Sequence, residues 1–113
     1  MSNEAIKHNL KRLLELHDSR DNPILRREIK QILNYHNDRQ LRLMIHELRV
    51  VDGLPVFFST DSPAGYWLPK NQEELDRGIA HWRSYIIELC KDLRDTRRAG
   101  ARWLIPATQK KLL

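Results

Sequence analysis

Side chains that could bind a metal ion or carry out catalysis are scattered, without the spacing that either task needs. The histidines are His8, His17, His36, His46 and His81; no two of them have the three-to-five spacing of a zinc site, and the single cysteine is Cys90. The sequence has no phosphate-binding glycine loop, nucleophile elbow or HExxH motif. The adjacent Glu73 and Glu74 suit the dipole of a helix start better than acid–base catalysis. The sequence therefore predicts a protein that is not an enzyme and has neither a metal nor a cofactor.

A different group of side chains lies in residues 38–49, DRQLRLMIHELR. At about 100° per residue, a helix here buries one stripe, and the opposite face carries both charged and apolar side chains. The buried stripe is Leu41, Met44, Ile45 and Leu48, and the outer face is Arg39, Leu43, His46 and Val50, flanked by Gln40 and Arg42. An ordinary solvated helix has little reason to expose leucine and valine beside arginine. We therefore expect this outer face to contact a partner.

Three helices should form the amino-terminal part of the chain. The first covers about Asn3–His17, with Ile6, Leu10, Leu13, Leu14 and His17 on one face. The second covers about Pro23–Leu33, is capped by Asn22, and buries Leu25, Ile29, Ile32 and Leu33, while Ile24 lies off that stripe and is only partly covered. The third begins at about Asp38, because Asn37 and Gln40 form a capping-box-like pair, and Gly53 ends it in a left-handed conformation.

A β-hairpin and a long helix should follow. The runs LPVFFST and GYWLP are rich in β-branched and aromatic residues and are separated by the turn sequence DSPA. Asn71 and Glu74 then open a helix from about Gln72 to Arg98, in which Gly78 costs about 1 kcal/mol relative to alanine. Cys90 in this helix is expected to be a small buried hydrophobic residue. A heptad seam runs along the helix and calls for a partner helix; its members are Leu75, Ile79, Trp82, Ile86, Leu89 and Leu93.

The expected order of helix, helix, short turn, helix and hairpin is that of a winged helix-turn-helix. Residues 38–69, DRQLRLMIHELRVVDGLPV followed by GYWLP, resemble the third helix and wing of winged helix-turn-helix DNA-binding domains. Such domains occur in small bacteriophage and prophage proteins and at the amino terminus of the biotin operon repressor. The family often has a small residue in place of Lys30 and glycine in place of Asn34, although asparagine tolerates the left-handed conformation better than most residues.

This resemblance implies binding to double-stranded DNA by the third helix, whose amino-terminal half would enter the major groove. Arginine can form two bonds with guanine, glutamine can form two with adenine, and leucine can contact a thymine methyl group. The implied contact residues are Asn37, Arg39, Gln40, Arg42, Leu43 and His46 in the third helix, Thr60 and Ser62 in the hairpin tip, and Arg97, Arg98 and Arg102 towards the carboxyl end. The task would be transcriptional regulation or an accessory role in phage replication or excision, in the cytoplasm of a bacterium or infected host.

The charge distribution leaves other readings open. The net charge is +5, but residues 37–70 carry four basic and four acidic side chains, and the excess falls in residues 94–113, with six basic and one acidic. We expect a winged domain over residues 1–70, a helix over 71–98 that forms a homodimer or instead packs on the first helix, and a basic tail over 99–113. The basic side chains of the helix end and the tail either follow the DNA backbone along an adjacent groove or form a solvated, partly disordered end; they are Arg94, Arg97, Arg98, Arg102, Lys110 and Lys111. The alternative function is a protein-interaction module that uses the winged fold as a scaffold.

Overall fold

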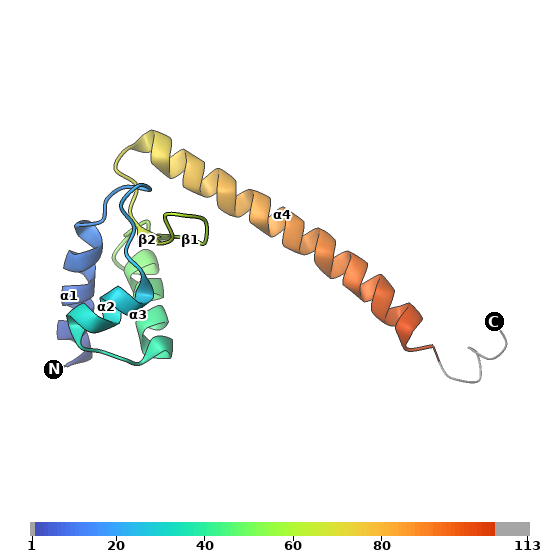
Figure 1. Ribbon diagram of the computed structural model, residues 1–113, viewed down its shortest axis with the longest axis horizontal. Helices are drawn as coiled ribbons and strands as arrows, with labels where there is room; N and C mark the ends of the chain where they lie inside the picture. Colours follow the sequence, from blue (N-terminus) through green and yellow to red (C-terminus); the bar gives the residue numbers. More distant parts are fainter. Residues whose placement is uncertain (1, 106–113) are drawn as a thin grey trace. The chain divides into compact units, whose positions relative to one another are not determined.

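The computed structural model describes residues 2–105, which form four helices and one antiparallel hairpin (Figure 1). The helices are α1 (Asn3–Glu15), α2 (Arg26–Leu33), α3 (Asp38–Val50) and α4 (Gln72–Trp103), and the strands are β1 (Phe57–Ser59) and β2 (Gly65–Trp67). The expected fold class, mainly helical with a small hairpin and a long carboxyl-terminal helix, is confirmed. The chain divides after Gly78 into two compact units. Within residues 2–105, no helix combines the length and apolar character needed to cross a membrane.

The core of the first unit lies between α1, α2 and α3 (Figure 1). The fully buried helical side chains are Leu10 and Leu14 from α1, Ile29 from α2, and Leu41 and Leu48 from α3. Burying one such side chain contributes about 1.5–3 kcal/mol. Helix α1 ends at Glu15 rather than at His17, because the next two amides turn back to the carbonyls of Leu13 and Leu14.

Helix α2 begins later than expected, and Asn22 does not cap it. Ile24 pairs with Tyr66 of β2 through two backbone hydrogen bonds of 2.8 Å, so this residue is extended and its side chain is only 1% exposed. The helix starts after Leu25, whose amide donates to the Glu28 carboxylate. The later start leaves Leu33 half-buried and Ile32 62% exposed. The expected burial of Ile32 and partial exposure of Ile24 are therefore wrong.

The hairpin pairs Phe57 with Trp67 and Ser59 with Gly65. On its buried face the rings of Phe57 and Trp67 stack with centroids 4.8 Å apart, and the Trp67 indole donates to the Ser59 hydroxyl at 2.9 Å. Gly65 has a φ of +134°, and a Cβ there would lie 2.5 Å from the Ile24 carbonyl oxygen. Glycine is therefore needed at position 65 for the segment that precedes α2 to lie against β2.

Helix α4 extends beyond its expected end at Arg98 and continues to Trp103. Arg102, placed by the sequence in a tail, is thus helical, and Lys110 and Lys111 lie outside the described residues. Cys90 is exposed, which corrects the expectation of a buried thiol. The expectation fails because burial requires a covering element, and a helical position alone does not supply one.

Gly78 of α4 lies against the hairpin. A Cβ at this position would be 2.6 Å from the edge of the Phe57 ring, which is itself buried and held by its stack on Trp67. The ring therefore has little room to move. Gly78 weakens the helix at this turn, but its lack of a side chain leaves the space that the Phe57 ring occupies.

We predict that Gly78→Ala lowers the free energy of unfolding by up to about 2 kcal/mol, because overpacking of about 1–3 kcal/mol outweighs the gain of about 1 kcal/mol in helix propensity. Chemical denaturation measures the change. Gly100→Ala is the matched control, since nothing lies within 4 Å of a Cβ there. An alanine at position 78 that stabilises as much as one at position 100 would contradict the packing explanation.

Candidate nucleic-acid interface

The turn between α2 and α3 depends on Asn34. This residue adopts the left-handed conformation, with φ 48° and ψ 48°, and its amide and that of Tyr35 close the carboxyl end of α2. The expectation that asparagine serves here in place of glycine is confirmed. The turn then leads to Asn37, whose side-chain oxygen accepts from the Gln40 amide at 3.1 Å and caps α3. Asn37 is therefore occupied in starting the helix, a role distinct from the expected contact with DNA.

The outer face of α3 has the composition that the sequence predicts. Leu41, Met44, Ile45 and Leu48 are buried, and Arg39, Arg42, Leu43 and His46 are exposed, while Gln40 is half-buried. Leu43 is 47% and Val50 65% exposed. The structure thus brings two guanidinium groups, an imidazole and an aliphatic side chain together on one helix face.

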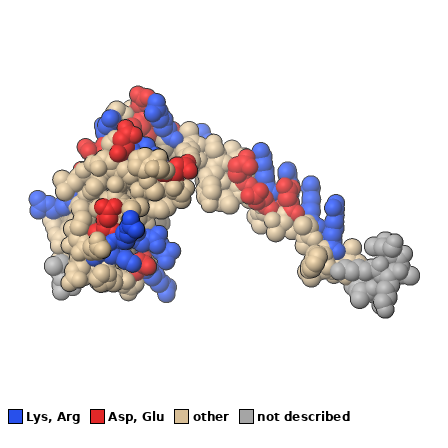
Figure 2. Space-filling model, in the orientation of Figure 1, with Lys and Arg blue, Asp and Glu red and all other residues tan. Residues whose placement is uncertain are grey.

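Asp38, the acidic residue at the start of α3, forms an ion pair with Lys30 of α2. The Lys30 ammonium lies 3.0 Å from the Asp38 carboxylate and lowers the pKa of that carboxyl, and the charges of Arg26 and Arg42 act in the same direction. Neither Arg39 nor Arg42 forms an ion pair or hydrogen bond within residues 2–105. Basic side chains gather at this end of the first unit (Figure 2). Because Lys30 occupies the Asp38 carboxylate, neither arginine forms an ion pair with it.

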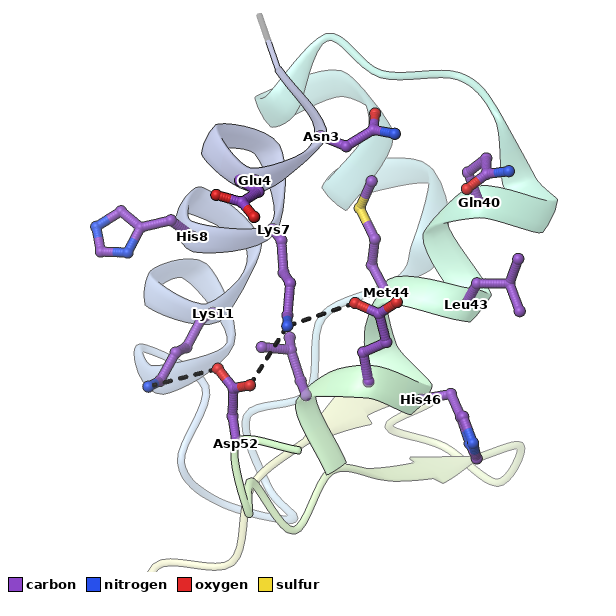
Figure 3. Close-up of a pocket in the computed structure, with 12 residues that line it drawn as sticks. Asn3, Glu4, Lys7, His8, Lys11, Gln40, Leu43, Met44, His46 and Asp52 are labelled. Carbon is purple, nitrogen blue, oxygen red and sulfur yellow. Dashed lines mark ion pairs between the residues drawn. The ribbon is translucent and has the colours of Figure 1, made fainter. Parts of the chain in front are cut away.

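The remaining acidic residues near α3 face α1. A surface groove of about 660 Å³ separates these helices, and in it the Lys7 ammonium lies 3.4 Å from Glu47 and 3.3 Å from Asp52 (Figure 3). Burial disfavours the charged form of Lys7, but the two carboxylates outweigh this effect and raise its pKa. Lys11 lies 3.9 Å from Asp52. These ion pairs join α1 to Glu47 of α3 and to Asp52 in the turn that follows the helix.

Arg49, at the end of the segment 38–49, has a structural role. Its side chain donates to the Val56 carbonyl at 2.7 and 3.2 Å, and burial lowers its pKa. It joins the end of α3 to the residue that precedes β1. Arg49 is thus separated in function from Arg39 and Arg42, although the sequence places all three in one motif.

The hairpin tip, residues 60–64, receives a cation from another part of the chain. Thr60 and Ser62 are exposed, as a wing contact requires. The Arg20 guanidinium, from the loop between α1 and α2, donates to the carbonyls of Asp61 and Pro63. The hairpin has no basic residue at its tip, and Arg20 supplies one. Sequence reasoning missed Arg20, because no local pattern connects residue 20 with residues 61–63.

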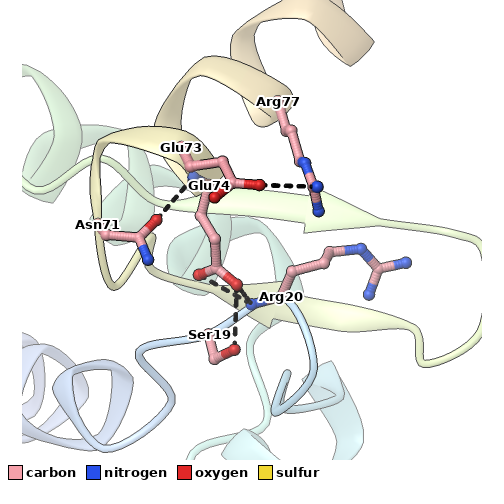
Figure 4. A network of polar contacts seen from close by, with 6 residues as sticks. All are labelled: Ser19, Arg20, Asn71, Glu73, Glu74 and Arg77. Atoms are coloured by element: carbon pink, nitrogen blue, oxygen red, sulfur yellow. Dashed lines mark hydrogen bonds and ion pairs between the residues drawn. The ribbon is translucent and has the colours of Figure 1, made fainter.

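Glu74 holds the backbone of this loop in place (Figure 4). Its carboxylate accepts from the Lys70 amide at 3.0 Å, the Arg20 amide at 3.2 Å and the Ser19 hydroxyl at 3.2 Å, and the side chain is 9% exposed. Burial would raise its pKa, but these hydrogen bonds lower it below the usual 4.5. The Glu74 amide donates to Asn71, which confirms the cap expected for α4.

The other expected contact residues, Arg97, Arg98 and Arg102, are exposed on α4 in the second unit. They share that unit with the heptad seam. In the described part of the chain, no group of three or more His, Cys, Asp or Glu side chains could hold a metal ion. Comparison with known proteins adds no relative: no family model, no curated protein and no solved structure matches this chain.

For the turn, we predict that Asn34→Ala lowers the free energy of unfolding by part of the roughly 1–2 kcal/mol that the left-handed conformation costs a residue with a Cβ, because asparagine tolerates this conformation better than alanine. Asn34→Gly should be as stable as the wild-type protein or more so. Thermal or chemical denaturation of the pair measures the difference. Equal stability of the alanine and glycine variants would mean that backbone conformation is not what selects asparagine.

For the loop, we predict that Glu74→Gln costs about 1–3 kcal/mol, because an amide cannot accept all three hydrogen bonds as a charged carboxylate does. The folded-state pKa is lowered, so this stabilisation is complete above the unfolded value near 4.5 and is lost as the pH falls through the lowered pKa. Unfolding curves from pH 7 to 3 should show the variant losing less stability than the wild type.

Glu73→Gln is the control for this comparison. Glu73 forms an exposed pair with Arg77 at 2.8 Å, which is worth at most about 1 kcal/mol. A Glu74 variant with the same stability and pH dependence as the Glu73 variant would overturn the role assigned to the buried carboxylate.

Proposed function

We propose that this protein binds double-stranded DNA as a winged helix-turn-helix protein, with the amino-terminal half of α3 in the major groove. It would serve transcriptional regulation or an accessory role in phage replication or excision. The observation that carries the proposal is the outer face of α3, where Arg39 and Arg42 are exposed and form no ion pair or hydrogen bond within the described residues, while every buried position of the helix is apolar. Arginine in this setting keeps its donors available for a guanine edge or a phosphate.

The surroundings of α3 support the same function. Asp38 is paired with Lys30, and Glu47 and Asp52 face the lysines of α1, so the acidic side chains of this region do not oppose the outer face. At the wing, Thr60 and Ser62 offer hydroxyl donors beside the charge of Arg20. Contacts of this kind position a protein on the phosphate backbone, and α3 would then read the bases.

The direct test is enrichment of random duplex DNA by the wild-type protein and by an Arg39→Ala, Arg42→Ala double variant. We expect the wild type to enrich a shared sequence motif, with binding that weakens steeply as salt rises. The double variant should lose the motif and bind the selected site about 10²–10⁴-fold more weakly, since each two-bond contact is worth about 1–3 kcal/mol.

A second double variant, Arg12→Ala with Arg77→Ala, is the matched control. It removes the same charge from exposed positions on α1 and α4 and should retain the motif. If both double variants lose binding equally, general electrostatic attraction is responsible and α3 does not read sequence. Absence of both enrichment and salt-sensitive binding would refute DNA binding.

A second candidate function is docking of a protein partner on α3. It is favoured by the apolar side chains Leu43, Val50 and Val51, which are 47%, 65% and 74% exposed. Leu43→Ser distinguishes the two functions, because a protein contact would depend on it strongly, while DNA binding with intact arginines would lose specificity at one base pair at most.

A further inference from the structure

The second unit has an exposed apolar seam along α4. Ile79, Ile86, Leu89 and Leu93 are 43%, 58%, 48% and 58% exposed, and they follow one another at heptad spacing with the half-buried Trp82 between them. Tyr85, 60% exposed, widens this seam on one side. Leu75, the first expected member, belongs to the first unit and is half-buried there. The seam available for pairing therefore runs from Ile79 to Leu93.

We propose that this seam pairs with the same seam of a second copy of the chain as a parallel, in-register, two-stranded coiled coil. In heptad terms, Ile79, Ile86 and Leu93 occupy position a, and Trp82 and Leu89 occupy position d. In parallel coiled coils, isoleucine at a with leucine at d favours two strands, and in such a pair each a side chain meets its own copy. The pairing goes beyond DNA binding and does not depend on it.

Two of the charges on α4, Asp92 and Arg97, fit this pairing. Ion pairs within the helix join Glu73 to Arg77, Glu88 to Lys91 and Arg94 to Asp95, and all six side chains occupy the outer positions b, c and f. Asp92, at position g, and Arg97, at position e, have no ion-pair partner within the described chain. These two charges flank the seam and can therefore pair with a neighbouring helix.

A parallel, in-register pair supplies that neighbour. In this arrangement a g side chain faces the e side chain five residues further along the other helix. Asp92 then faces Arg97 of the partner subunit, and the symmetry makes the contact twice. The earlier g positions, Gly78 and Tyr85, face Arg83 and Cys90 of the partner subunit, so no like charges meet.

The pairing also divides the basic residues expected to contact DNA. Arg97 joins the interface between the helices. Arg94, Arg98 and Arg102 occupy positions b, f and c and remain on the outer face, where all three are exposed. Of these three, Arg94 is paired with Asp95, while Arg98 and Arg102 form no ion pair within the described residues and can contact a phosphate backbone.

The first test is the mass of the full chain in solution, measured by light scattering without DNA. We expect two chains per particle for the wild type and one for Ile86→Asp. Ile87→Asp is the matched control, because Ile87 is 49% exposed on the same turn but at position b, and this variant should remain a dimer. A wild-type mass of one chain at high concentration, or equal effects of the two variants, would overturn the proposal.

Charge reversal tests the register. Asp92→Arg and Arg97→Asp should each weaken self-association by about threefold to tenfold, since each introduces like charges at two contacts. An equimolar mixture of the two variants should regain wild-type affinity, because opposite charges then meet in the mixed dimer. A mixture no tighter than the separate variants would show that Asp92 and Arg97 do not meet between chains.

Cysteine pairing tests the direction of the helices. In a Cys90→Ser background, Ile79→Cys and Leu93→Cys should each form a disulfide-linked dimer under mild oxidation, although the positions are about 21 Å apart along the helix. In an antiparallel pair, a residue meets its own copy only at the two-fold axis. Cross-linking at one position alone would therefore overturn the parallel arrangement. The proposal of DNA binding would stand, because enrichment of duplex DNA tests it separately.

Discussion

The carboxylate of Glu74 is the contact on which the arrangement of the first unit depends. It accepts hydrogen bonds from the loop between α1 and α2 and from the residue that precedes α4. It accepts from the Arg20 backbone, and the guanidinium of the same residue donates to the carbonyls of the hairpin tip. Glu74 and Arg20 thus connect three segments that are distant in sequence, namely the loop between α1 and α2, the residue before α4, and the hairpin tip. Hydrogen bonds to a charged, mostly buried acceptor are among the stronger ones in proteins, which suits this role.

Backbone pairing provides the second connection between the helices and the hairpin. Ile24 forms two hydrogen bonds with Tyr66, and Gly65 permits the two backbones to approach. This pairing sets where α2 can begin and therefore where α3 lies after the turn at Asn34. The outer face of α3 is consequently positioned by contacts that do not include any of its own exposed residues.

Local sequence signals predicted much of this fold. The caps at Asn37 and Asn71, the left-handed turn at Asn34 and the buried stripe of α3 each depend on residues within one or two turns of one another, and all four were predicted. Contacts between distant segments were not. The start of α2 was misplaced because Ile24 is paired with β2, and Gly78 was judged by helix propensity alone because the Phe57 ring lies far away in sequence.

The candidate site shows the same division. The exposed face of α3 followed from helical periodicity, whereas the pairing of Lys30 with Asp38 and the placement of Arg20 at the hairpin tip require the folded chain. Residues 37–70 have equal numbers of acidic and basic side chains, yet the acidic ones near α3 are turned towards Lys7, Lys11 and Lys30. A survey that ranks segments by isoelectric point would miss such a surface. Its positive charge arises from the direction in which the side chains point, and the net charge of the segment does not record that direction.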